Sequence, residues 1–137
     1  MAIMHVVAGV LLDTAGRVLL AQRPTGKHLA GMWEFPGGKL ESGEAPQAGL
    51  ARELHEELDI RVEPSGIAPL TRVPWSYGER ELLLDAWWVH AWQGAPRSVE
   101  GQALQWRHPR DIEPAQLAPA DREILRAVAL SSRPQRV

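Results

Sequence analysis

The sequence contains no cysteine among its 137 residues, so disulfide bonds, thiolate nucleophiles and cysteine-ligated metal centres are excluded. An excess of basic residues is also missing, because 15 Lys and Arg stand against 17 Asp and Glu. That balance argues against a general nucleic-acid-binding surface. No apolar run approaches the ~20 residues of a membrane-spanning helix, and residues 1–5 lack the basic start of a signal peptide. We therefore expect a cytoplasmic protein with neither a membrane nor a nucleic-acid partner.

Length and patterning predict one α/β domain. Apolar residues make up 45% of the chain and charged residues 23%, as in ordinary globular proteins. Residues 1–131 are expected to form a single domain, and the polar residues 132–137 to fray. The order of strand-like and helix-like segments indicates a mixed sheet with helices packed on it.

Short apolar runs predict the strands. Val6 to Leu12 and Val18 to Ala21 flank a turn that contains Asp13 and Gly16, and so predict a β-hairpin. The segment 23–38 is rich in glycine and proline and is expected to be mostly loop. The other expected strands are a weak one within 60–73, a long one over 82–92 and a short one over 103–106.

Two segments predict helices. Pro46 to Leu58 places Leu50, Leu54 and Leu58 four residues apart in one apolar stripe, and its proline fits the first position of a helix. The second helix is expected over 119–130, which also carries apolar residues on one side.

The first predicted helix has a second, acidic face. Glu53, Glu56 and Glu57 lie three and four residues apart, so their carboxylates project together and repel one another. A divalent cation would turn that repulsion into attraction, and Mg²⁺ takes oxygen ligands and often shares phosphate oxygens with a substrate. Arg52 precedes Glu56 by four residues and could orient its carboxylate. Taken alone, however, an acidic helix face is usually just solvated.

A glycine pair precedes this helix. Gly37 and Gly38 have no Cβ, so their backbone can approach an ion or a phosphate closely, and Lys39 adds a positive charge beside them. These parts suit phosphoryl chemistry, in which positioning and charge neutralisation do most of the work. Taken alone, a Gly-Gly pair is usually a turn.

The two motifs occur in one register. The spacing is that of the Nudix box, with Gly38, Glu44, Arg52-Glu53-Leu54 and Glu56-Glu57 in their places. The chain therefore resembles the Nudix hydrolases, and the segments 22–24, 31–39, 100–102 and 118–121 resemble the MutT branch of oxidised-nucleotide and CTP pyrophosphohydrolases. The resemblance implies the Nudix fold, an α/β/α sandwich with a mixed sheet. It also implies hydrolysis of a nucleoside triphosphate to a monophosphate and pyrophosphate.

The resemblance further implies a Mg²⁺ site, for which Mn²⁺ could substitute. By position, its ligands would be the Gly37 carbonyl, Glu53, Glu56, Glu57 and Glu100. Glu53 is the expected base for the attacking water, Glu100 is the second candidate, and Arg52 completes the catalytic set. A carboxylate beside metal ions can act as ligand, base or both, and the sequence does not divide these roles.

Substrate-binding residues are implied in the same way, and they are Arg23, Gly38, Lys39, Tyr77, Arg80 and Asp121. Either arginine could equally be an ordinary surface residue. An ionised Asp121 would only accept hydrogen bonds, which suits the donors of a guanine-type base or of cytosine. Capping of the last helix explains this residue equally well. Further aromatic candidates for a base pocket are Trp33, Trp75 and Trp88.

One position departs from the family pattern. Asp59 stands where the pattern has a glycine that would end the helix in the left-handed conformation. Asp can adopt that conformation at some cost, so we expect a strained or altered helix end with the catalytic carboxylates untouched.

The leading hypothesis is a Mg²⁺-dependent pyrophosphohydrolase that removes 8-oxo-dGTP from the nucleotide pool, as a monomer or weak dimer. The second hypothesis is hydrolysis of CTP or of a modified pyrimidine nucleotide. A third, of another class, is a Nudix-fold domain that binds a nucleotide without turnover. The intact carboxylate set argues against this third hypothesis, and only Asp59 favours it.

Overall fold

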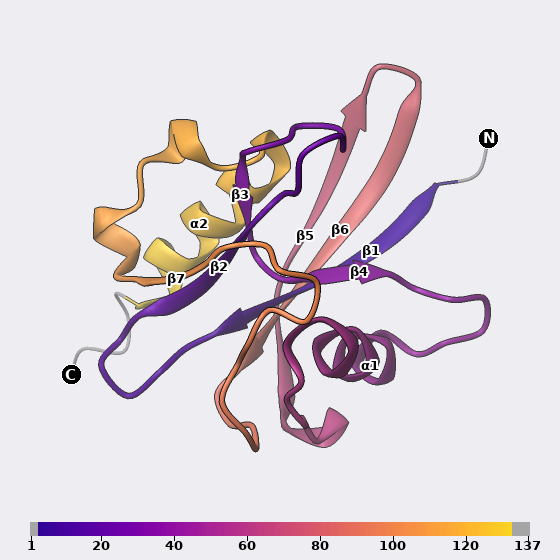
Figure 1. The fold of residues 1–137 in the computed structure, drawn as a ribbon. Coiled ribbons are helices and arrows are strands. Elements are labelled where there is room, and N and C mark those ends of the chain that lie inside the picture. Colours follow the sequence, from indigo (N-terminus) through magenta and orange to yellow (C-terminus); the bar gives the residue numbers. More distant parts are fainter. Residues whose placement is uncertain (1–2, 133–137) are drawn as a thin grey trace.

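The computed structural model describes residues 3–132, in which four strands precede the first helix and three further strands separate it from the second (Figure 1). The strands are β1 Met4–Leu11, β2 Val18–Gln22, β3 Trp33–Glu34, β4 Gly37–Lys39, β5 Ile67–Tyr77, β6 Arg80–Val89 and β7 Leu104–Arg107. The helices are α1 Pro46–Leu58 and α2 Pro119–Ser132, with short 3₁₀ turns at Pro64–Gly66, Pro109–Asp111 and Pro114–Gln116. Of the tail predicted to fray, residues 133–137 lie outside the described residues. No helix within residues 3–132 has the length and apolar character needed to span a membrane.

Two sheets and two helices build the fold. The larger sheet has the order β4-β1-β6-β5, with β1 and β6 parallel and the other neighbours antiparallel. The smaller, antiparallel sheet has the order β3-β2-β7. Helix α1 packs on one face of the larger sheet and α2 on the other (Figure 1). The predicted α/β/α sandwich with a mixed sheet is confirmed.

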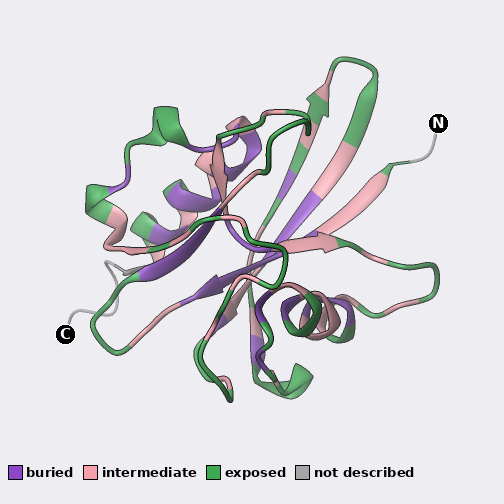
Figure 2. Ribbon diagram, viewed as in Figure 1, coloured by how far each residue is buried: buried purple, intermediate pink, exposed green. Residues whose placement is uncertain are grey.

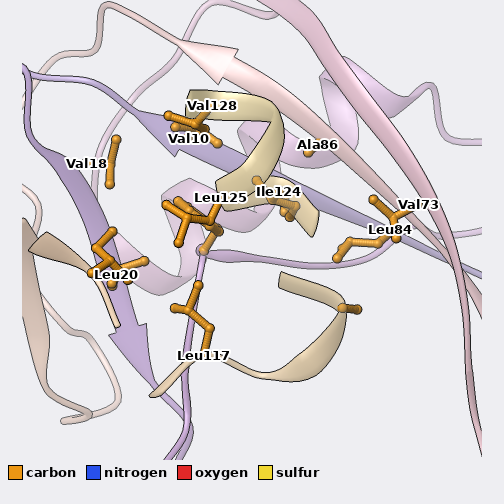
Figure 3. Packing of buried hydrophobic residues seen from close by; sticks show 14 residues of the cluster. Val10, Val18, Leu20, Val73, Leu84, Ala86, Leu117, Ile124, Leu125 and Val128 are labelled. Atoms are coloured by element: carbon orange, nitrogen blue, oxygen red, sulfur yellow. The ribbon is translucent and has the colours of Figure 1, made fainter. Parts of the chain in front are cut away.

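Strand β1 divides the core in two. Successive side chains of a strand point to opposite faces, so Val7 and Leu11 pack with α1, whereas Ala8 and Val10 pack with α2. On the α2 side, Ile124 of the helix lies close to the sheet residues (Figure 3). Buried residues therefore occupy the middle strands and the inner faces of both helices (Figure 2).

The predicted hairpin between the first two strands is wrong. Beyond the turn at Asp13, β1 and β2 share one isolated bridge, between Leu12 and Val18, and then enter different sheets. The cause is non-local, because β4 and β6 already occupy both edges of β1. Strand β2 instead pairs with β3 and β7. The segment 23–38 is mostly loop, as predicted, but it also holds β3 and the start of β4.

The weak strand predicted within 60–73 proves to be β5, an 11-residue strand that forms a tight hairpin with β6. Pro69 and Pro74 do not end it, because β5 lies at the edge of the sheet, where a missing N–H is tolerated. A register shift between Pro69 and Thr71 marks a bulge in this edge strand. Strand β6 begins and ends earlier than the predicted 82–92, and β7 lies close to the predicted 103–106.

Both predicted helices are present. Helix α1 has the predicted bounds, and α2 extends through Ser132. Helix α1 ends at Asp59, whose backbone is left-handed (φ 57°, ψ 38°) and whose N–H donates to the His55 carbonyl. The expected strain is present, because Asp59 has a positive φ although it carries a Cβ. The helix still ends in the left-handed conformation that a glycine would adopt here.

Removing the middle of the α1 stripe should destabilise the fold. Leu54 is fully buried, so Leu54→Ala is expected to lower the free energy of unfolding by about 2–5 kcal/mol, through lost burial and the cavity left behind. Urea unfolding measures this change. Leu130→Ala is the control, because Leu130 is 59% exposed and its truncation should change stability by no more than about 0.5 kcal/mol. Equal losses in the two variants would contradict this packing.

Candidate active site

A cleft of about 550 Å³ opens between β1, β4, the β5–β6 hairpin and the start of α2. All six residues predicted to bind substrate line it: Arg23, Gly38, Lys39, Tyr77, Arg80 and Asp121. His28, Glu34 and Phe35 also line it and were not predicted. The tryptophan candidates lie elsewhere, because Trp33, Trp75 and Trp88 pack against the core beneath α2. The cleft therefore gathers side chains from segments that are far apart in the sequence.

Carboxylates gather around Glu57. Burial raises the pKa of Glu57, and the nearby Glu53, Glu34, Glu100 and Glu56 raise it further, to about 8. Three of the five residues lie on α1, Glu34 lies on β3, and Glu100 lies on the loop before β7. The structure thus brings the four predicted acidic residues together and adds Glu34. In the sequence, Glu34 is an isolated acidic residue in a segment expected to be loop, so nothing local singled it out.

Arg52 is the cation within this cluster. It donates to both carboxylate oxygens of Glu44, at 2.7 and 2.9 Å, and this pair is the main reason that the pKa of Glu44 falls to about 2. Its Nη1 also lies 3.2 Å from an oxygen of Glu53 and 3.2 Å from an oxygen of Glu56. Arg52 therefore orients two carboxylates of α1 while Glu44, just before the helix, holds Arg52 in place.

The two glycines of β4 serve different purposes. A Cβ on Gly37 would overlap the backbone carbonyl oxygen of Val7, whereas a Cβ on Gly38 would overlap the carboxylate of Glu53. Gly37 thus allows β4 to lie close to β1, and Gly38 leaves room for the Glu53 carboxylate beside β4.

The donor set suits a divalent cation that prefers oxygen ligands. Carboxylates and the Gly37 carbonyl supply only oxygen, and a cation would offset the repulsion that raises the pKa of Glu57. Because Gly38 lacks a Cβ, the Glu53 carboxylate lies directly against β4, the strand that carries the Gly37 carbonyl. Within residues 3–132, no three acidic or histidine side chains already converge on one ion position.

A second charged group lines the cleft. Arg23 donates to Glu34 at 2.9 Å, and Asp121 accepts a hydrogen bond from the Phe35 backbone N–H at 2.9 Å. Helix α2 begins at Pro119, so Asp121 lies inside its first turn, and the capping alternative is wrong. Instead, the Asp121 carboxyl ties the start of α2 to the segment between β3 and β4.

Burial also changes the protonation state of Asp121. It is 7% exposed, and burial together with the charge of Glu34 raises its pKa to about 8. The raised pKa favours the protonated form, whereas the sequence led us to expect an ionised group. A protonated carboxyl can donate a hydrogen bond as well as accept one, which widens the base edges that it can match.

Tyr77 joins three walls of the cleft. Its hydroxyl accepts a hydrogen bond from the Ala120 N–H at 3.1 Å, and its ring meets His28 edge-on with centroids 5.1 Å apart. The tyrosine thereby connects the β5–β6 hairpin to α2 and to the loop before β3. Elsewhere on the wall, Lys39 and Arg80 form no ion pair with any residue in the range 3–132, so both charges are available to a ligand.

Known proteins resemble this chain in sequence. A family model described as NUDIX domain matches residues 7–127. This chain belongs to the NUDIX domain family. It is 39% identical over 128 residues to the CTP pyrophosphohydrolase of Escherichia coli (strain K12), and this match covers 93% of this chain and 92% of that protein. It is 41% identical over 98 residues to the 8-oxo-dGTP diphosphatase of Proteus vulgaris, and this match covers 72% of this chain and 86% of that protein.

The fold agrees with solved structures of the same family. The solution structure of the E. coli ORF135 protein matches with a TM-score of 0.85 and 34% identity, over 100% of this chain and 96% of that one. The predicted membership in the Nudix hydrolases, and with it the enzyme class, is confirmed. Nudix hydrolases generally use a divalent metal ion, in keeping with the oxygen-rich donor set around Glu57.

Substitutions at the two glycines should separate folding from activity. Gly38→Ala is expected to lower kcat/KM by about a hundredfold while sparing the Tm, because its Cβ displaces the flexible end of Glu53. Gly37→Ala should lower the Tm, since its Cβ meets the backbone of β1. Thermal unfolding and nucleotide hydrolysis measure the two effects. Gly66→Ala, which faces open space, should change neither. A Tm loss in Gly38→Ala equal to that in Gly37→Ala would contradict the assignment.

Asp121→Asn should remove part of the pH dependence of stability. The pKa of Asp121 is about 8 in the folded protein and roughly 3.9 in an unfolded chain, so the folded state retains a proton that the unfolded state has lost. The free energy of unfolding therefore falls as the pH rises between these two pKa values. The Asn side chain does not titrate, so it removes this fall, and its carbonyl oxygen still accepts the hydrogen bond from the Phe35 N–H. The Tm measured between about pH 4 and pH 9 tests this. The exposed Asp111→Asn should keep the wild-type slope, and an unchanged slope in Asp121→Asn would refute the assignment.

Proposed function

We propose that this Nudix hydrolase is a Mg²⁺-dependent nucleoside triphosphate pyrophosphohydrolase that acts on 8-oxo-dGTP. The observation that carries the proposal is the carboxylate cluster around Glu57, in which Arg52 contacts Glu53 and Glu56. It lies beside a cleft that the cations Lys39 and Arg80 line. A negatively charged polyphosphate fits between these two kinds of charge once a divalent cation bridges it to the carboxylates. The Proteus vulgaris diphosphatase supports the choice of substrate.

The reaction breaks one phosphoric anhydride bond. Water attacks a phosphorus atom, pyrophosphate leaves, and the nucleoside monophosphate remains. Bound at the carboxylates, the cation would neutralise phosphate charge and acidify the attacking water. Glu53 takes the proton of that water, with Glu100 as the second candidate base. Burial raises the pKa of Glu53, which makes its carboxylate a better base, and Arg52 fixes its direction.

The other residues hold the two ends of the substrate. In this proposal Glu53, Glu56, Glu57, Glu100 and the Gly37 carbonyl hold Mg²⁺, which Mn²⁺ can replace. Lys39 and Arg80 face the phosphates, and Asp121, Tyr77 and Arg23 line the base end. We further propose that residues 1–131 act as one catalytic domain, as a monomer or weak dimer.

CTP is the second candidate substrate. The E. coli CTP pyrophosphohydrolase covers 93% of this chain, more than the Proteus relative does. Asp121 can serve either base, because its carboxyl can meet the amino group of cytosine or the N–H groups of a guanine-type base.

The test measures kcat/KM for a nucleotide panel with Mg²⁺ and the effect of Glu53→Gln. We expect 8-oxo-dGTP to be the best substrate, with pyrophosphate released. Loss of the general base should lower kcat by about 10²- to 10⁴-fold. Glu63→Gln is the matched control, because it removes the same charge from an exposed position after α1.

Two outcomes would change the proposal. Equal or better turnover of CTP or dCTP would move the substrate assignment to the second candidate. Nucleotide binding without pyrophosphate release, at the same level in the wild type and Glu53→Gln, would indicate a binding domain that does not catalyse hydrolysis.

A further inference from the structure

The loop that carries Glu100 is attached to the end of α1. The Arg97 N–H donates to the Leu58 carbonyl at 3.0 Å, and the Val99 N–H donates to the Glu57 carbonyl at 3.0 Å. The last carbonyls of a helix have no partner within the helix, so this loop satisfies two of them. Its backbone thereby runs beside Glu57, and Glu100 follows directly.

An ion pair reinforces this attachment. The Arg97 Nε donates to an Asp59 carboxylate oxygen at 2.9 Å. Asp59 is the residue that replaces the glycine of the family pattern, and its left-handed backbone sets the direction of its side chain. A glycine at this position would end the helix equally well but would offer Arg97 no side-chain acceptor. This contact therefore depends on the departure of this chain from the pattern.

The loop brings a further acidic residue close to the acidic face of α1. Glu100 is exposed and directly follows Val99, whose N–H donates to the Glu57 carbonyl at 3.0 Å. Further back along the loop, Gln93 forms two backbone hydrogen bonds with Arg61, at 3.0 and 2.9 Å. Between Gln93 and Glu100, the loop is held by the Asp59–Arg97 ion pair and by the backbone hydrogen bonds that Arg97 and Val99 donate to the end of α1.

We propose that Asp59 and Arg97 are positioning residues that hold Glu100 beside Glu57 before the metal ion binds. This inference rests on the proposed function, in which Glu100 is a metal ligand. Because the pair acts on the metal-free protein, its loss should weaken metal binding and leave kcat at saturating metal nearly unchanged. A pair that only stabilised the fold would alter the Tm instead.

Three single variants test the inference. Asp59→Asn keeps a residue that tolerates the left-handed backbone and removes the charge. Asp59→Gly restores the family residue and relieves the positive φ. Arg97→Ala removes the other partner. The matched control is Arg126→Ala, because Arg126 forms a comparable exposed ion pair with Glu123 away from the cleft.

Two readouts apply to each variant. The first is the rise in Tm with added Mn²⁺ or Mg²⁺ and no nucleotide, which gives an apparent metal dissociation constant. The second is the Mg²⁺ concentration at half-maximal rate. We expect all three variants to need about two- to fivefold more metal, which is the change in affinity that the loss of one exposed ion pair would cause. The double variant Asp59→Asn/Arg97→Ala should need no more than either single one, and Arg126→Ala should match the wild type.

The outcome for Asp59→Gly is the sharpest. We expect its metal-free Tm to equal or exceed that of the wild type while its metal affinity falls, a combination that a purely structural role does not give. Wild-type metal affinity in Asp59→Gly and Arg97→Ala would overturn this inference and leave the proposed function intact. A wild-type protein with no metal response and no metal-dependent turnover would overturn both.

Discussion

Repulsion between carboxylates around one half-buried residue is the constraint on which this structure depends. Burial and the charges of the nearby Glu53, Glu34, Glu100 and Glu56 together raise the pKa of Glu57 to about 8. Arg52 contacts Glu53 and Glu56, and Arg23 contacts Glu34. The remaining repulsion is opposed by the chain itself, which fixes the carboxylates on a helix, a strand and a loop. A divalent cation bound at these carboxylates would supply the charge that this arrangement lacks.

The fold provides the rigidity that such a cluster needs. Strand β1 is paired along both edges and packed on both faces, so β4 and α1 are built on a support that cannot move easily. Gly37 keeps β4 close to β1, and Gly38 leaves space for the Glu53 carboxylate beside β4. On the other face, the buried Asp121 fixes the start of α2 to Phe35. The carboxylate cluster and the Asp121 end of the cleft are thus fixed by opposite layers of one sandwich.

Local signals predicted α1 and the acidic face, because the Leu50–Leu54–Leu58 stripe and the box spacing both lie within one short segment. Features that depend on distant partners were not predictable. The first hairpin failed because β1 had other neighbours, and β5 was underestimated because its prolines are harmful only away from a sheet edge. The place of Glu34 in the cluster and the raised pKa of Asp121 follow from burial and from charges far away in the sequence. Neither burial nor the position of distant charges can be read from a single sequence.

The most direct test of the central claim is to locate a bound ion. Crystals of the protein soaked in Mn²⁺ would be measured at a wavelength where manganese scatters anomalously. The account predicts an anomalous peak within bonding distance of the Glu53 and Glu57 carboxylates and the Gly37 carbonyl, with Glu100 drawn toward it. A fully soaked crystal whose only manganese peaks lie away from Glu57, with the carboxylates unmoved, would contradict it.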